Sequence, residues 1–177
     1  NNPSLRVIKK NCFNGRSLQN GQAFSKLVIE TLPDCVTTIE DYAFMYTAIV
    51  DSPFSPTSKC TFIGHQAFAE CTSLKEVFIP KDATFVTDLS NYGDSNQKSG
   101  FFFNCQSLER VTFHEDAQVK VLPTYMFASC SSLKTIKIPN SVTTIGYGAF
   151  AGCSSLQEFR GKFASEDGRC LIIDGAL

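Results

Sequence analysis

The stretch NSVTTIGYGAFAGCSSL, residues 140–156, decides the fold because the chain returns to it at a nearly constant distance. Within this stretch, Cys153 follows Phe150 by three residues and Leu156 follows it by six. The phenylalanines that anchor the successive copies are Phe13, Phe44, Phe68, Phe102, Phe127 and Phe150. Their separations are 31, 24, 34, 25 and 23 residues, which gives a base period of 23 with insertions of 8, 1, 11 and 2 residues. Self-similarity at such a period indicates a solenoid of stacked repeats.

Each repeat combines two short extended runs with a tight turn. In the copy that runs from Leu74 to Pro80, Val77 and Ile79 fall on one face of a strand, and the proline ends that strand because it lacks a main-chain donor. Residues 142–146 form a second β-prone run, and the following Gly-x-x-Ala-Phe segment suits a single helical or 3₁₀ turn. We therefore predict a β-rich, right-handed coil with a parallel strand face, in which equivalent residues stack in columns.

The repeats account for residues 1–177 as a single solenoid segment of about six repeats. The largest insertion is predicted at about residues 84–100, and the fourth repeat lacks a residue in the position of Ile145. The second repeat places Pro53 and Ser55 in core strand positions. Turn signals on both sides of a short β-prone run predict a C-terminal capping hairpin at about residues 163–177.

Composition excludes several classes of partner. A net charge of −1 gives no electrostatic reason to expect binding of nucleic acid or of an anionic membrane. No apolar run of 18 residues is present, so no transmembrane helix is expected. The hydrophobic content of 43% is sufficient for a continuous core.

The eight cysteines follow the repeat rather than a disulfide framework. Four of them come three residues after an anchor phenylalanine: Cys71, Cys105, Cys130 and Cys153. Cys60 and Cys12 occupy the positions of Val142 and Ala149, which we expect to be small and buried. Stacked strands would hold Cβ atoms ~4.8 Å apart, whereas a relaxed disulfide prefers ~3.8 Å, so we expect thiols. Cys35 and Cys170 have no assigned position, and the redox compartment stays open.

No catalytic or metal-binding constellation is recognisable, so we expect no enzymatic activity and no cofactor or metal. His65 and His114 belong to different repeats without carboxylates or cysteines at ligand spacing, and both are predicted to be loop or solvent-facing residues. The long insertion has oxygen-bearing side chains at loose spacing: Asp88, Asn91, Asp94 and Asn96. Their acidic density is too low for a recognised calcium loop, and a plain polar loop is the simpler interpretation.

The outward positions of the predicted strand face are candidates for binding. Three of them should form an exposed apolar stripe: Val28, Phe54 and Phe78. Four others are charged: Glu76, Arg110, Lys137 and Arg160. Tyr92, in the insertion, is a further candidate contact. The stripe is explained equally by a protein partner, since aromatic residues and arginine favour interface cores, or by ordinary cross-strand stacking.

Residues 140–156 resemble the repeat motif of BspA-type, or Treponema-type, leucine-rich-repeat proteins, and the resemblance extends from about Leu5 to about Phe163. It implies an α/β leucine-rich-repeat solenoid in an exported adhesive protein, at the cell surface or secreted, with its signal or lipid anchor outside this sequence. It also implies protein or glycan partners, possibly on host or bacterial surfaces, and no shared catalytic residues.

Two functions are therefore open. The first is a non-catalytic binding module that uses the outer strand face and the insertion loop. The alternative is a structural spacer or stalk within a longer surface protein, with no ligand of its own. In either case the two ends of a solenoid carry unpaired edges, so self-association through the ends is expected.

Overall fold

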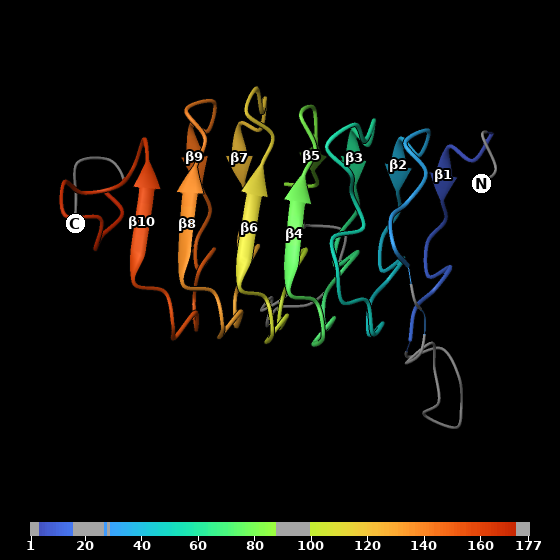
Figure 1. Cartoon of the computed structure of the whole chain (residues 1–177), viewed down its shortest axis with the longest axis horizontal. Helices are drawn as coiled ribbons and strands as arrows, with labels where there is room; N and C mark the ends of the chain where they lie inside the picture. The colour runs from blue at the N-terminus through green and yellow to red at the C-terminus, as the bar shows by residue number, and fades with distance from the viewer. Residues whose placement is uncertain (1–3, 16–26, 28, 88–99, 173–177) are drawn as a thin grey trace.

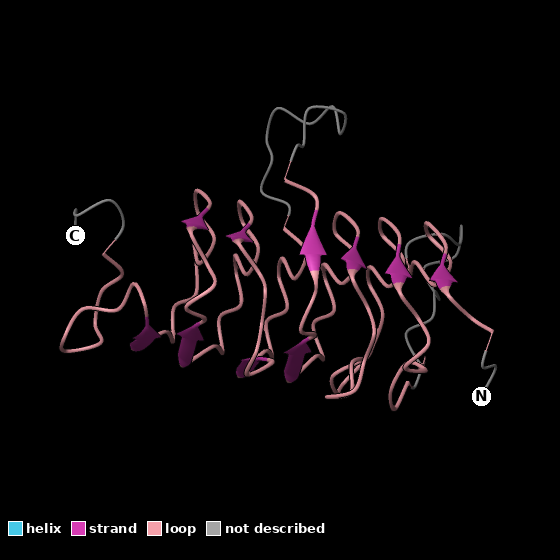
Figure 2. Cartoon of the chain, turned by 90° about the horizontal axis from the view of Figure 1, so that it is seen from above, coloured by secondary structure: helices cyan, strands magenta, loops and turns pink. Residues whose placement is uncertain are grey.

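The computed structural model describes residues 4–15, 27, 29–87 and 100–172. Figure 1 shows an elongated stack of repeats with β1 and β10 at opposite ends. Figure 2, seen from above, shows the strands in two rows on opposite sides of the stack. The predicted solenoid with parallel strand faces is confirmed, and its described part contains strands and turns but no helix.

The longer strands form one parallel sheet, the front sheet. These strands are β4 (Glu76–Ile79), β6 (Arg110–Phe113), β8 (Thr135–Ile138) and β10 (Glu158–Gly161), in the order β10-β8-β6-β4. Side chains alternate along them, so that Val77 and Ile136 point into the core while Glu76 and Lys137 point to solvent. This alternation confirms the strand that was predicted from the spacing of Val77 and Ile79.

The second row consists of two-residue strands from the second extended run of each repeat. They are β1 (Val7–Ile8), β2 (Thr38–Ile39), β3 (Phe62–Ile63), β5 (Thr84–Phe85), β7 (Val121–Leu122) and β9 (Thr144–Ile145). The first four make one parallel sheet, and β7 and β9 make another, so the row is interrupted between β5 and β7. The interruption coincides with the two-residue insertion that follows β6.

The anchor phenylalanines form the interior column that the sequence predicts. All five neighbouring pairs are stacked, with ring centroids 5.1–5.9 Å apart and interplanar angles of 4–12°. Phe44, Phe68, Phe102 and Phe127 are fully buried, while Phe13 and Phe150 at the two ends are half-buried. Offset stacking of this kind contributes ~0.5–1.5 kcal/mol per pair beyond the burial of area.

The predicted helical or 3₁₀ turn is wrong in detail. The Gly-x-x-Ala-Phe segments form successive hydrogen-bonded turns, in which Ala67 N donates to Gly64 O (3.2 Å) and Ala149 N to Gly146 O (3.2 Å). Helix formation is blocked because residues two before and two after the anchor adopt positive φ, as in Tyr125 (54°) and Ser129 (61°). Only in the last repeat are both positions glycine, Gly148 and Gly152.

Main-chain hydrogen bonds between repeats follow different patterns on the two sides of the stack. On the turn side, the N–H of one repeat donates to the next repeat, as from Phe44 to the carbonyl of Ala67 (2.8 Å). On the front-sheet side, the parallel ladder exchanges bonds in both directions, and just before the strands the N–H of the later repeat donates to the earlier one, as from Glu109 to Lys75 (2.8 Å). Each repeat is therefore tied to both neighbours by directional bonds.

Two details of the predicted repeat boundaries need correction. Phe85 in β5 is in register with Ile63 of β3, so the position equivalent to Ile145 is filled in the fourth repeat and not lost. The strand also takes residues 84–85 out of the predicted insertion, which lies after β5. Cys12, expected in a small buried position, is exposed because it lies in the first repeat, whereas Ala43 and Ala67 in the same position are covered by neighbours.

The described part of the predicted C-terminal hairpin, residues 163–172, turns back on itself. Ala164 and Leu171 form an antiparallel bridge, and Ile172 N donates to Phe163 O (2.7 Å). Phe163 and Leu171 pack against the core, and Phe159 N of β10 donates to Gly168 O (2.6 Å). The hairpin therefore covers part of the outer edge of β10.

Candidate functional site

The outward side of the front sheet is mostly polar and charged. The exposed residues that point outward from its strands are Glu76, Arg110, Thr112, Thr135, Lys137 and Arg160. Strand pairing places Glu76 beside Arg110 and Arg160 beside Lys137. The structure thus brings the four charged residues predicted from the sequence onto one continuous surface.

Two ion pairs organise this surface. Arg110 Nη1 lies 3.3 Å from Glu76 Oε2 across β6 and β4, and Arg160 donates to both carboxylate oxygens of Glu158 at 2.7 and 2.9 Å. The hydrogen bonds from Arg160 lower the pKa of the Glu158 carboxyl. Lys137 lies between these pairs and forms no ion pair with any residue in the described ranges.

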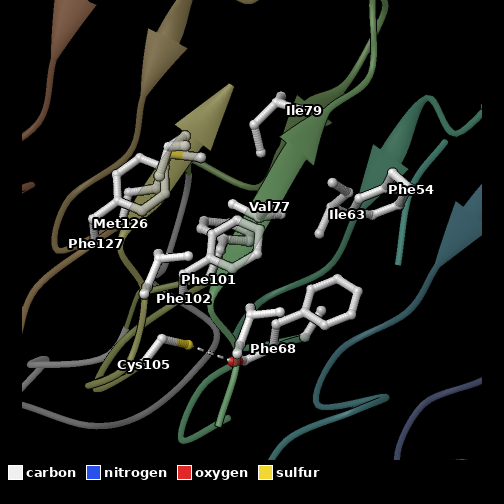
Figure 3. Close-up of a cluster of buried hydrophobic side chains, with 14 of the residues drawn as sticks. Phe54, Ile63, Phe68, Val77, Ile79, Phe101, Phe102, Cys105, Met126 and Phe127 are labelled. Carbon is white, nitrogen blue, oxygen red and sulfur yellow. Dashed lines mark hydrogen bonds between the residues drawn. The ribbon is translucent and has the colours of Figure 1, made fainter. Parts of the chain in front are cut away.

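The predicted apolar stripe is wrong at Phe54. This side chain is only 3% exposed and packs edge-on against Phe68, with centroids 5.7 Å apart. Figure 3 shows Phe54 inside the stack beside Ile63. The second repeat forms no front strand within its described residues, and Ser52 takes part in its irregular turn by accepting from the N–H groups of Phe54 and Phe78. Without regular alternation, Phe54 turns into the core.

Phe78 is the remaining described residue of that stripe, and it is only half-buried. Its ring meets His114 edge-on at 6.1 Å. Val28 and Tyr92, together with Asp88, Asn91, Asp94 and Asn96, lie outside the described residues. Among the described residues of the predicted stripe, Phe78 alone remains as a candidate apolar contact on the front sheet, and its ring is partly covered.

His65 lies in a turn, in agreement with the predicted loop position, but it is a buried core residue and does not face solvent. It is 2% exposed and lies edge-on to both Tyr42 (5.7 Å) and Phe101 (6.3 Å). Burial lowers the pKa of its imidazole, an effect that the nearby Asp41 carboxylate partly opposes. Asp41 also accepts the main-chain N–H of His65 (2.9 Å). His114 is half-buried, and its Nδ1 accepts from Asp116 N (3.0 Å).

The four cysteines that come three residues after an anchor phenylalanine form the cysteine column: Cys71, Cys105, Cys130 and Cys153. They make specific hydrogen bonds that were not predicted from the sequence. Each thiol donates to the carbonyl of the anchor phenylalanine one repeat earlier, at 3.1–3.2 Å, as from Cys105 to Phe68 (Figure 3). Thr47 occupies the same position in the second repeat and donates to the carbonyl of its own anchor, Phe44 (2.7 Å). Burial raises the pKa of Cys71 to about 11 and that of Cys60 to about 12, and all eight cysteines are free thiols.

A groove of about 560 Å³ opens at the end of the front sheet between β6 and β8. It is lined by residues 111–118 on one side and 137–141 on the other. Of the four charged candidates, only Lys137 borders it. The hydroxyl oxygen of Ser141 is buried at its wall and has no hydrogen-bond partner among the described residues.

Among the described residues, no group of three or more histidine, cysteine, aspartate or glutamate side chains is arranged to hold a metal ion. The part of the chain that the structure describes also contains no helix long and apolar enough to cross a membrane.

Comparison with solved structures identifies proteins that share this fold. The pneumococcal vaccine antigen PcpA superposes with a TM-score of 0.67 at 21% identity, over 92% of this chain and 38% of its own. A leucine-rich-repeat protein from Bacteroides ovatus superposes with a TM-score of 0.51 at 22% identity, over 90% of this chain and 44% of its own. This chain thus spans less than half the length of either protein.

Comparison of the sequence itself gives the family. No curated protein sequence matches the chain. The sequence profile described as "BspA type Leucine rich repeat region (6 copies)" matches residues 1–96 and 37–165, which together span most of the chain. The chain belongs to the BspA-type leucine-rich-repeat family.

Proposed function

We propose that the chain is a non-catalytic binding module of a surface-exposed or secreted protein, and that it contacts protein or glycan partners through the front sheet. The observation that carries the proposal is the continuous outward surface from β4 to β10, where Glu76, Arg110, Lys137 and Arg160 are displayed on rigid strands. The description of one structural relative as a vaccine antigen supports exposure outside the cell.

The size of the front sheet limits what it can bind alone. Four parallel strands at ~4.8 Å spacing and four residues each present a projected area on the order of 200 Å². A standard protein interface buries ~800 Å² per partner, so a stable complex must also use neighbouring loops. The insertion after β5 is the proposed additional contact, and its residues 88–99 lie outside the described part of the chain.

The proposal is tested by charge reversal on the front sheet. The double variant Arg110→Glu/Arg160→Glu is compared with Lys59→Glu/Lys120→Glu, which makes the same change in net charge at exposed positions outside the front sheet. Binding to immobilised matrix proteins and to a glycan array is measured by biolayer interferometry at several salt concentrations.

We expect the front-sheet variant to bind a captured partner about tenfold more weakly, and the control to retain its affinity. Equal affinity of both variants would contradict the use of the front sheet. If the chain binds neither the immobilised matrix proteins nor the glycan array, the spacer function is favoured instead.

A further inference from the structure

The front sheet is open between the last residues of β6 and β8. The two strands pair at Arg110–Thr135 and Val111–Ile136, and the pairing stops there although both strands continue. On their other sides these strands stay paired along their full length, β6 with β4 and β8 with β10. The opening is therefore a local separation of two otherwise regular strands, and it coincides with the groove lined by residues 111–118 and 137–141.

A proline prevents the ladder from closing at this point. Between β4 and β6, the ladder continues past the strand end because His114 N donates to Ile79 O (3.0 Å). Pro139 holds the position of His114 in the next repeat, and proline has no N–H to donate. No equivalent bond can therefore tie the end of β8 to β6.

The loop after β6 is held against the repeat that precedes it, away from β8. Gln118 N donates to Lys81 O (2.7 Å), Asp116 lies 3.9 Å from Lys81 Nζ, and the ring of His114 meets Phe78. This loop also contains the two extra residues of the repeat. Ala117 takes the position of Val142. Leu122 follows Ala117 at the fifth position, whereas Ile145 follows Val142 at the third.

The groove consequently presents strand edges that lack a partner strand. Successive residues of a strand direct their main-chain groups to opposite neighbours. Because His114 N–H points to β4, the N–H and carbonyl of Phe113 face the groove, opposite the edge of Lys137. The buried side chains of Val111 and Ile138 are among the lining residues, and Ser141 adds a buried hydroxyl that has no hydrogen-bond partner among the described residues.

We propose that this groove, the β6–β8 groove, binds a short extended peptide segment that carries an acidic side chain. The main chain of the segment would pair with the free edges at Phe113 and Lys137, which is the mode of recognition by strand addition. Its acidic side chain would meet the ammonium group of Lys137, which is exposed and forms no ion pair within the described ranges.

The dimensions of the groove fit such a segment. Its volume of about 560 Å³ lies within the ~300–1,000 Å³ typical of ligand pockets. At ~3.3 Å per residue, the open ends of the two strands match about two or three residues of an extended chain. The inference rests on the proposed function only in that both require a protein partner, and it places recognition in the groove rather than on the charged surface.

The test uses the full 177-residue chain, labelled with ¹⁵N, and a defined peptide probe. The probe is a pool of pentapeptides with a central glutamate, acetylated at one end and amidated at the other. A second pool is N-methylated on its main chain, which removes the donors needed for strand pairing. Chemical-shift changes are followed at Phe113, Lys137 and Ser141, and a change confined to these residues and their neighbours is expected with the first pool only.

A matched pair of variants localises the binding. Thr112→Trp places a bulky ring beside the groove, whereas Thr135→Trp makes the same change at an exposed outward position of β8 that does not line it. We expect Thr112→Trp to weaken binding about tenfold and Thr135→Trp to leave it within about twofold. Lys137→Gln should weaken binding of the glutamate pool but not of a pool with central glutamine.

Several outcomes would overturn the inference. These are the absence of shifts at millimolar peptide, equal binding of the N-methylated pool, or equal loss in both tryptophan variants. A melting temperature near that of the wild type confirms that each variant is folded. A failure here would leave the proposed function standing if Arg110→Glu/Arg160→Glu still loses a captured partner, because neither arginine lines the groove.

Discussion

At the scale of single residues, the cysteine column shows how one repeated side chain serves the stack. Its thiols are small enough for the core and still donate to a carbonyl of the preceding repeat. Thr47, in the same position, shows that a hydroxyl donor is also accommodated there. The position therefore selects a small side chain with a donor, and not cysteine chemistry as such.

This interpretation predicts opposite results for two substitutions of nearly equal shape. Cys105→Thr keeps a hydroxyl donor at this position, as Thr47 does in the second repeat, whereas Cys105→Val removes the donor to the buried carbonyl of Phe68. A buried group without its partner costs ~1–3 kcal/mol, so we expect the valine variant to be the less stable by about that amount. Urea denaturation measures the difference, and a valine variant at least as stable as the threonine variant would contradict the role of the hydrogen bond.

His65 makes stability depend on pH. Because burial lowers the imidazole pKa in the folded protein below its ordinary value of 6.5, the unfolded chain takes up this proton first. The free energy of unfolding should therefore be highest above pH 6.5 and fall as the pH decreases toward 5. His65→Phe, which retains a ring between Tyr42 and Phe101, should flatten this dependence in thermal melts. An unchanged slope between pH 7 and 5 in that variant would show that other groups cause it.

At the scale of elements, β6 and β8 show that strand length and strand pairing are separate properties. Both strands are four residues long, yet they pair over only two. The proline after β8 and the anchored loop after β6 together explain the difference. The same loop coincides with the interruption between β5 and β7 in the second row of strands.

The opening predicts a specific pattern of amide hydrogen exchange. Phe113 N–H faces the groove, whereas Val111 N–H lies where β6 and β8 are still paired. We expect the amide of Phe113 to exchange at least tenfold faster than that of Val111 in the native protein, because exchange reports local opening. Two-dimensional NMR in D₂O measures both amides, and equal protection would mean that the strands close in solution.

The periodic features of these elements could be predicted from the sequence, while the exceptions could not. The phenylalanine column, which includes Phe68 and Phe127, and the cysteine column, which includes Cys130, follow from the repeat spacing alone. Each repeat must present the same type of residue to its neighbour. The inward turn of Phe54 depends on the hydrogen bonds of Ser52, and the burial of His65 on rings from two adjacent repeats. The groove could not be predicted because it depends on two features of neighbouring repeats, Pro139 after β8 and the insertion after β6. A repeat motif that is considered alone does not contain such a relation.

At the scale of the whole molecule, stability is a sum over neighbouring repeats, since each repeat contacts only the adjacent ones. The phenylalanine column illustrates this dependence. Phe102 is fully buried between Phe68 (5.6 Å) and Phe127 (5.5 Å), while Phe13, which stacks on Phe44 (5.1 Å), is half-buried. A side chain in the middle of the stack therefore supports two interfaces.

We expect the removal of a phenylalanine ring from the middle of the column to lower the stability more than its removal from the end. Phe102→Ala should lower the free energy of unfolding by about 3–5 kcal/mol, the range for a fully buried phenylalanine, and Phe13→Ala by clearly less. Chemical denaturation followed by circular dichroism provides both values. Equal losses would mean that the first repeat is packed as tightly as the central ones.

The ends of the stack also predict association between molecules. Phe150, Leu156 and Phe159 in the last repeat are half-buried, whereas Phe127, Leu133 and Ile136 in the preceding repeat are fully buried. Sedimentation equilibrium should therefore show an average mass that rises with protein concentration. A single monomer mass up to millimolar concentration would exclude association through the ends.

The main-chain hydrogen bonds of the turn side all run from one repeat to the next, so the two ends of the stack differ chemically. On the turn side, the N–H groups of each repeat point to the next repeat and its carbonyls to the previous one, as from Phe127 N to Ala149 O. Each edge of the front sheet carries both kinds of group, and Phe159 N on the outer edge of β10 donates to Gly168 O. The leading end of one copy is thus chemically complementary to the trailing end of another, whereas two identical ends present like groups to each other. Any assembly by end contacts should consequently grow head-to-tail into linear chains rather than close as a twofold dimer.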